Sequence, residues 1–117
     1  MTSTQKAELI TTIVDDMKAE SIETLDVSER TALADFFIVC GGTSDVHVES
    51  IADKVIMKLR DEKIRPLRVE GKRSGWILVD YGDVILHVMR DEQRQYYDLE
   101  SLWKTNLREP SVVEPEA

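Results

Sequence analysis

This 117-residue chain has one cysteine, three prolines and few aromatic residues, which make up 6% of the sequence. Cys40 cannot form a disulfide within the chain, which is typical of proteins from a reducing compartment. No apolar run reaches the roughly 20 residues that a membrane-spanning helix needs. The N-terminus is polar and lacks the apolar segment of a signal peptide. These absences favour a cytoplasmic location of the bacterial type, with an organellar protein stripped of its targeting segment as the alternative.

Positive charge is also scarce. The chain has 15 Lys and Arg against 23 Asp and Glu, a formal net charge of -8 at pH 7. A protein that recognises a nucleic-acid sequence usually carries a basic stripe that neutralises phosphates, so that class is disfavoured. Hydrophobic residues make up 42% and charged residues 32% of the chain, the composition of one ordinary globular domain. Basic proteins or small ligands are therefore the expected partners.

Hydrophobic periodicity predicts an α/β domain over residues 1–104, followed by a flexible acidic tail over residues 105–117. The expected elements are an amphipathic helix over 4–20, a short edge strand over 21–27, a buried strand over 35–40, a helix that begins near 43 with an apolar stripe from 48 to 59, and a strand over 64–70. A strand, a glycine pair and a helix form half of a βαβ unit. We therefore expect the strand over 64–70 to return parallel to the buried strand.

Two β-rich segments, 76–81 and 84–89, flank Gly82-Asp83, a connection of the Gly-X type that is typical of a tight hairpin. Alternation predicts that one face of this hairpin belongs to the core. Its expected cross-strand pairs are Ile77 with Val88, Val79 with Leu86, and Tyr81 with Val84. The pairs on the second face are Trp76 with Met89, Leu78 with His87, and Asp80 with Ile85.

Two interpretations of the second face remain open. A helix covers it, or it binds a partner protein with Trp76 as the anchor and with Asp80 and Asp83 facing basic residues. For Asp83 alone, a role as a turn residue is favoured. His87 lies diagonally to Asp80, within reach of a hydrogen bond. Beyond the hairpin, residues 91–97 predict a polar helical turn, and residues 98–103 have the spacing of a last helical turn that docks on the domain.

No catalytic residue, cofactor or metal site is predicted. Gly41 and Gly42 precede a helix and are placed where a phosphate can bind, but neither the dinucleotide fingerprint nor the Walker A pattern is present, so simple turn chemistry is favoured. The chain lacks an Asp-X-Asp pair for divalent metals. Cys40 ends a buried strand, and two histidines with one cysteine do not make a zinc site. A small nucleotide-binding or nucleotidyltransferase-like enzyme is kept as the alternative function.

Several segments follow one another in a characteristic order. They are Asp35-Phe36-Phe37-Ile38-Val39, Gly42-Thr43-Ser44, Ile51-Ala52-Asp53, Arg65-Pro66-Leu67-Arg68-Val69-Glu70-Gly71, Gly75-Trp76-Ile77-Leu78-Val79-Asp80-Tyr81-Gly82-Asp83-Val84, His87-Val88, and Tyr96-Tyr97-Asp98-Leu99-Glu100-Ser101-Leu102-Trp103. Together they resemble the ribosomal silencing factor family, also called RsfS or Iojap, from residue 7 to residue 103. The sequence departs from the usual family pattern at Phe36, His47 and Met89, where Tyr, Gln and Phe are common.

The resemblance implies a mixed, about five-stranded sheet flanked by helices, with a nucleotidyltransferase-like topology but no catalytic carboxylates. It also implies a cytoplasmic, non-enzymatic factor that binds large-subunit ribosomal protein fourteen, blocks joining of the small subunit, represses translation when nutrients are scarce, and forms a homodimer when free. By position, the partner-binding residues would be Trp76, Leu78, Asp80, Tyr81, Asp83 and His87, with Tyr97 and Asp98 as second-rank candidates. Residues 1–104 keep a net charge of -6, which would favour a basic ribosomal protein over the surrounding RNA.

Overall fold

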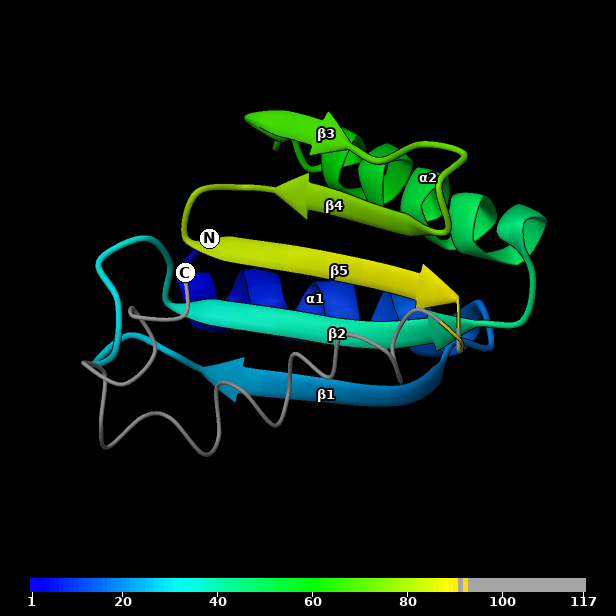
Figure 1. Ribbon diagram of the computed structural model, residues 1–117. Coiled ribbons are helices and arrows are strands. Elements are labelled where there is room, and N and C mark those ends of the chain that lie inside the picture. Colours follow the sequence, from blue (N-terminus) through cyan, green and yellow to red (C-terminus); the bar gives the residue numbers. More distant parts are fainter. Residues whose placement is uncertain (91, 93–117) are drawn as a thin grey trace.

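The computed structural model describes residues 1–90 and residue 92. Its elements are α1 (Ser3–Asp16), β1 (Glu20–Asp26), β2 (Phe36–Gly42), α2 (Asp45–Asp61), β3 (Arg68–Glu70), β4 (Trp76–Asp80) and β5 (Val84–Arg90). The strands form one sheet in the order β1-β2-β5-β4-β3 (Figure 1). Only β2 and β5 pair in parallel, and the other neighbours are antiparallel. The predicted five-stranded mixed α/β domain is confirmed.

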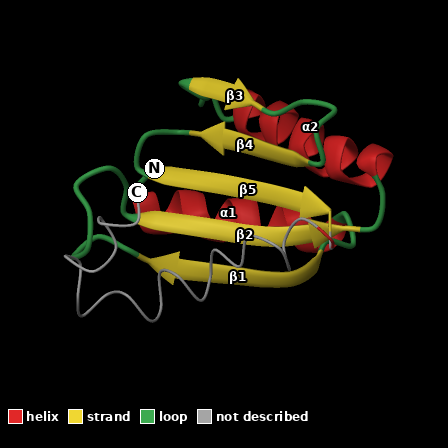
Figure 2. Ribbon diagram, in the orientation of Figure 1, coloured by secondary structure: helices red, strands yellow, loops and turns green. Residues whose placement is uncertain are grey.

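Both helices lie on the same side of the sheet (Figure 2). Thr2 and Gln5 form a reciprocal capping box at the start of α1, and the Ser44 hydroxyl accepts a hydrogen bond from the His47 amide at the start of α2. Each helix then turns one apolar stripe toward the sheet. Neither helix is long and apolar enough to cross a membrane.

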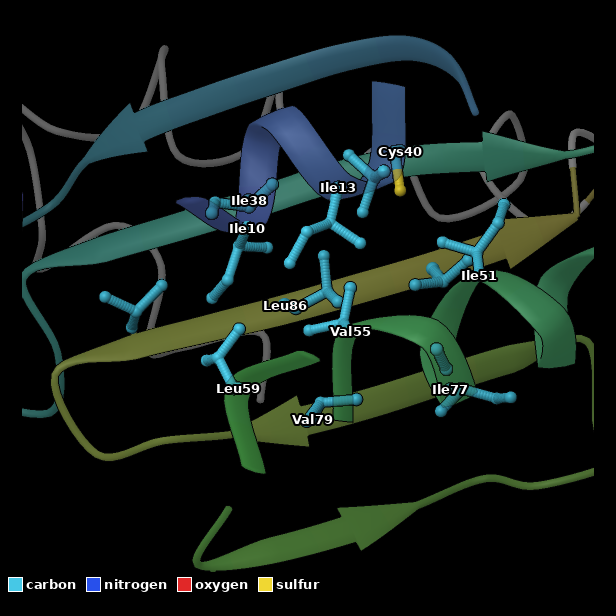
Figure 3. Close-up of a cluster of buried hydrophobic side chains, with 14 of the residues drawn as sticks. Ile10, Ile13, Ile38, Cys40, Ile51, Val55, Leu59, Ile77, Val79 and Leu86 are labelled. Carbon is cyan, nitrogen blue, oxygen red and sulfur yellow. The ribbon is translucent and has the colours of Figure 1, made fainter. Parts of the chain in front are cut away.

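The main core fills the space between the two helices and the sheet (Figure 3). Its fully buried members include Ile10, Ile38, Ile51, Val55, Leu59, Ile77, Val79 and Leu86. Strand β2 is buried along almost its whole length, as its continuous apolar run predicts. Cys40 is one of the buried core residues on this strand.

The predicted position of the strand after α2 is wrong. We expected residues 64–70 to pair with the buried strand, but β3 contains only three residues and pairs antiparallel with β4 at the edge of the sheet. The position beside β2 belongs to β5, whose residues from Val84 to Met89 are all buried. β5 is more apolar than β3 and takes the interior position, whereas the stretch that contains Pro66 and two arginines is suited to an edge.

The predicted edge position of the first strand and the predicted hairpin are both confirmed. The first strand lies at an edge, and the hairpin register is confirmed residue by residue. The Tyr81 amide donates to the Val84 carbonyl at 2.9 Å, which closes the hairpin over Gly82 and Asp83. The predicted helical turns over 91–97 and 98–103, and the tail over 105–117, lie outside the described residues.

Gly42 shows how tightly α2 approaches the sheet. A Cβ atom at this position would lie 2.7 Å from Cγ2 of Val48 and 3.2 Å from its amide nitrogen. Val48 is fully buried in the first turn of α2, so it has little freedom to move away. Gly42 therefore allows close packing between the end of β2 and the helix.

We expect Gly42→Ala to lower the free energy of unfolding by about 1–3 kcal/mol, because the added carbon overpacks a filled site. Urea denaturation of Gly42→Ala, Val48→Ala and the double variant measures the coupling. The double variant should lose less stability than the sum of the two single variants, because Val48→Ala removes the clashing carbon. Strict additivity would show that the two residues do not compete for this space.

Candidate protein-binding surface

The hairpin of β4 and β5 has two faces with different surroundings. Ile77, Val79, Tyr81, Val84, Leu86 and Val88 point into the main core under the helices. The opposite face, which we call the Trp76 face, consists of Trp76, Leu78, Asp80, Ile85, His87 and Met89. Neither α1 nor α2 covers it, since both helices lie on the other side of the sheet (Figure 2). The predicted helical turns over 91–97 and 98–103 lie outside the described residues, so coverage of this face by a helix is excluded only for α1 and α2.

A second apolar cluster supports the Trp76 face from the side of β1. It contains Leu25, Val27, Ala34, Phe37 and Ile85, with Leu78 packed against it. On β5, Ile85, His87 and Met89 are buried, whereas Trp76, Leu78 and Asp80 on β4 are only partly buried. The accessible part of the Trp76 face is therefore a strip along β4.

Trp76 is held in place by His87. The indole Nε1–H donates to Nδ1 of His87 at 3.2 Å, and the two ring centroids are 6.1 Å apart. On its other side, the imidazole makes an edge contact with Phe37 at 5.4 Å. In place of the predicted hydrogen bond to Asp80, His87 accepts one from Trp76.

His87 is uncharged in this setting. Its side chain is only 6% exposed, and burial lowers the pKa of His87 to about 4. Because Nδ1 accepts the indole proton, the imidazole carries its own proton on Nε2. Nε2 is buried and has no hydrogen-bond partner in the described part of the chain. A neutral imidazole thus acts as a fixed acceptor that orients the tryptophan.

Asp80 organises the neighbouring strand and turn. Its Oδ2 accepts from Nε of Arg68 at 3.1 Å, and its Oδ1 accepts from the Gly82 amide at 2.8 Å. Arg68 also contacts Glu70 on its own strand at 2.7 Å, so one carboxylate from β4 and one from β3 share its guanidinium. Sequence reasoning missed Arg68 as a member of this surface, because it placed the strand of residues 64–70 beside β2. The acid predicted to face a basic partner is already paired within the chain.

Asp83 has a comparable internal role. Its Oδ1 accepts from Nζ of Lys6 at 2.9 Å, which ties the first turn of α1 to the hairpin turn. Its backbone carbonyl accepts from the amides of Asp35 and Phe36 at 2.8 and 3.1 Å. These contacts agree with the favoured interpretation of Asp83 as a turn residue.

Tyr81 does not share a surface with Trp76. Its side chain is 7% exposed, belongs to the main core, and has a hydroxyl without a hydrogen-bond partner in the described part of the chain. Burial raises the pKa of Tyr81 to about 12. The structure thus brings Trp76, Leu78, Asp80 and His87 onto one face but turns Tyr81 to the other. Tyr97 and Asp98 lie outside the described residues.

The loop between β2 and α2 has its own internal partners. Nδ1 of His47 accepts from the Thr43 amide at 3.0 Å, and Nε2 of His47 donates to the Met17 carbonyl at 2.8 Å. Together with the Ser44 cap, these bonds occupy amides that a phosphate would need. Among the described residues, no group of His, Cys, Asp or Glu side chains is arranged to hold a metal ion.

Comparisons with known proteins point to one family. A family model described as "Ribosomal silencing factor during starvation" matches residues 1–117. The chain is 36% identical over 104 residues to the ribosomal silencing factor RsfS of Halalkalibacterium halodurans, which covers 88% of this chain and 89% of the relative. It is 40% identical over 90 residues to the RsfS of Bacillus subtilis, with 76% of each chain covered.

Two solved structures have the same fold. Protein CV0518 from Chromobacterium violaceum superposes with a TM-score of 0.86 at 36% identity, covering 89% of this chain and 88% of that one. A protein from Bacillus halodurans superposes with a TM-score of 0.78 at 36% identity, covering 86% and 94% of the two chains. A more distant relative, 27% identical over 82% of this chain, is the mouse protein named "Mitochondrial assembly of ribosomal large subunit protein 1".

We expect His87 to make stability depend on pH. Between about pH 6.5 and pH 4, the unfolded chain binds a proton on His87 that the folded chain does not, so the free energy of unfolding falls as the pH falls. A shift from 6.5 to about 4 corresponds to about 3 kcal/mol. Urea denaturation across this pH range measures the free energy of unfolding. The parent protein should lose about 3 kcal/mol more of it than His87→Gln loses. Parallel profiles for the two proteins would mean that His87 is charged in the folded state.

Proposed function

Because this chain belongs to the ribosomal silencing factor family, we propose that it binds the large ribosomal subunit and sterically prevents the small subunit from joining it. This function requires a rigid surface that fits the partner and enough bulk to occupy the space of the other subunit. It requires no bond to be made or broken. We further propose that the protein acts in a bacterial cytoplasm, represses translation when nutrients are scarce, and is a homodimer when free.

The observation that carries the proposal is the fixed Trp76 on a face that neither α1 nor α2 covers. A partly exposed tryptophan whose ring orientation is already set loses little conformational freedom on binding, so more of its contact energy contributes to affinity. Tryptophan is also among the residues that contribute most to protein interfaces. Leu78 extends the apolar surface along β4, and Asp80 and Arg68 form a polar border.

For the partner, we propose large-subunit ribosomal protein fourteen. A basic ribosomal protein suits the acidic chain at long range, since a net charge of -8 raises the rate of encounter with a positive surface. At short range, Asp80 and Asp83 already have cationic partners within the chain. Recognition at contact distance would then depend on Trp76 and Leu78, with the two acids shaping the hairpin rather than supplying its main binding energy.

The alternative, a nucleotide-binding or nucleotidyltransferase-like enzyme, would have to use the loop between β2 and α2. Ser44 and His47 already bond the amides at the start of α2, which weighs against a phosphate there. Calorimetry with a nucleoside triphosphate and Mg²⁺ discriminates the two functions. Saturable, metal-dependent heat would support the enzyme, whereas the silencing function expects none.

Trp76→Ala should weaken binding to purified large subunits by about 30-fold or more, the effect of removing a central aromatic residue from an interface. Co-sedimentation with the subunits measures the affinity, and light scattering during subunit association measures the block of joining. Trp76→Ala should lose both activities together.

Two further variants separate the surface from the fold. Tyr81→Phe removes a buried hydroxyl from the opposite face and should leave binding unchanged. Trp76→Phe keeps an aromatic ring but removes the bond to His87, so its affinity should lie between those of the parent and Trp76→Ala. Equal binding by the parent and a folded Trp76→Ala would exclude this surface.

A further inference from the structure

Positive charge is concentrated in one part of this acidic chain. Residues 54–73 contain eight Lys and Arg and three Asp and Glu, a net charge of +5, whereas the remaining 97 residues sum to -13. Residues 1–53, by contrast, contain eleven acidic and three basic residues. The net charge of -8 therefore conceals a strong charge asymmetry.

The fold places this basic segment at one edge of the sheet. Residues 54–73 run from the middle of α2 through β3 into the turn before β4, and β3 is the edge strand opposite β1 (Figure 1). The acidic first half of the chain includes β1 at the other edge. The β3 edge is thus richer in basic residues than β1, and Asp45, Glu49 and Asp53 of α2 line one pocket together with Arg73.

Several cations at the β3 edge have no ion-pair partner in the part of the chain that the structure describes. Lys63, Arg65 and Arg73 are exposed and form no ion pair within the described residues, although Asp61 and Glu62 lie nearby in the sequence. Of the others, Arg68 is bound by Asp80 and Glu70, and Lys72 is 3.6 Å from Asp53. Lys58 and Arg60, in the last turn of α2, have a separate explanation because they offset the helix dipole. That explanation does not extend to Arg65 or Arg73, which lie outside the helix.

The turn that carries Lys72 and Arg73 has a defined shape. Gly71 has a φ of +88°, and a Cβ there would clash with the Trp76 carbonyl oxygen. The Ser74 amide donates to the Gly71 carbonyl at 3.0 Å, and the Arg90 amide donates to the Gly75 carbonyl at 2.8 Å. This turn directly precedes Trp76 in the chain, so the basic edge adjoins the proposed protein-binding surface.

From this placement, we propose that the β3 edge, through Lys63, Arg65 and Arg73, binds the phosphate backbone of RNA that borders the protein contact. The proposal rests on the proposed function, which brings the chain to an RNA-rich particle. Strand addition by an acidic protein is disfavoured, because β3 has three residues and follows Pro66. The recognition is of phosphate charge and not of base sequence.

The test compares two double variants that each remove two positive charges. Arg65→Gln with Arg73→Gln alters the β3 edge, whereas Lys18→Gln with Arg30→Gln alters exposed residues on either side of β1. Arg73 and Lys18 both have positive φ, at 68° and 67°, so each pair includes one substitution in strained backbone. Affinity for purified large subunits is measured between 50 and 200 mM salt.

For the β3-edge variant, the slope of log affinity against log salt should be about 1 to 2 smaller in magnitude than for the parent. Its affinity at 50 mM salt should be about tenfold or more weaker. The β1-side variant should match the parent in slope. Against isolated large-subunit protein fourteen, which carries no RNA, the parent and both variants should bind equally.

Three outcomes would overturn the proposal. Equal slopes for the parent and the β3-edge variant would exclude phosphate contacts. Equal slope changes in both variants would indicate a net-charge effect. Weaker binding of the β3-edge variant to the isolated protein would make the partner a protein surface. In each case Trp76→Ala still reports on the proposed function independently, whereas failure of the parent to bind large subunits would remove both proposals together.

Discussion

The fold depends on the burial of β5 between β2 and β4. All residues from Val84 to Met89 are buried, and both neighbours pair with this strand along its length. On the helix side, Val84, Leu86 and Val88 anchor the main core. On the other side, Ile85 joins the second apolar cluster and His87 supports Trp76. Because strand side chains alternate, a shift of one residue would exchange these two sets and destroy the core and the Trp76 face at once.

Local signals in the sequence were sufficient to predict the hairpin of β4 and β5 and its register. Gly82-Asp83 selects the turn, and alternation of apolar residues on both sides then fixes every cross-strand pair from Trp76 with Met89 to Asp80 with Ile85. The position of β3 could not be obtained in this way. Whether the strand after α2 lies beside β2 or at the edge depends on competition with β5, which occurs later in the chain and is more apolar. Such competition is a property of the whole sheet, and the local signal, Pro66 with two arginines, favours an edge without identifying the strand that takes the place beside β2.

The same limit applies to the candidate surface. Alternation placed Trp76, Leu78, Asp80 and His87 on one face, and the structure agrees. The hydrogen-bond and ion-pair partners of the polar residues could not be predicted from the sequence. Lys6 and Asp83 are separated by 77 positions, and Arg68 reaches Asp80 only because β3 pairs with β4. These internal pairs change the role of the acids, since a carboxylate that already has a cation gains less from a second one and must lose solvent to bind it.

Burial of the His87 imidazole lowers the free energy of unfolding, which bears on the role of this residue. An apolar residue at this position would avoid burying the Nε2–H, which has no hydrogen-bond partner among the described residues, a deficit of about 1–3 kcal/mol. In a domain whose whole stability is about 5–15 kcal/mol, that cost is substantial. The imidazole supplies what an apolar side chain lacks, an acceptor that fixes the indole of Trp76. A side chain that lowers stability while orienting a partly exposed aromatic residue supports the proposal that Trp76 binds a partner, and it links the energetics of β5 to the surface on β4.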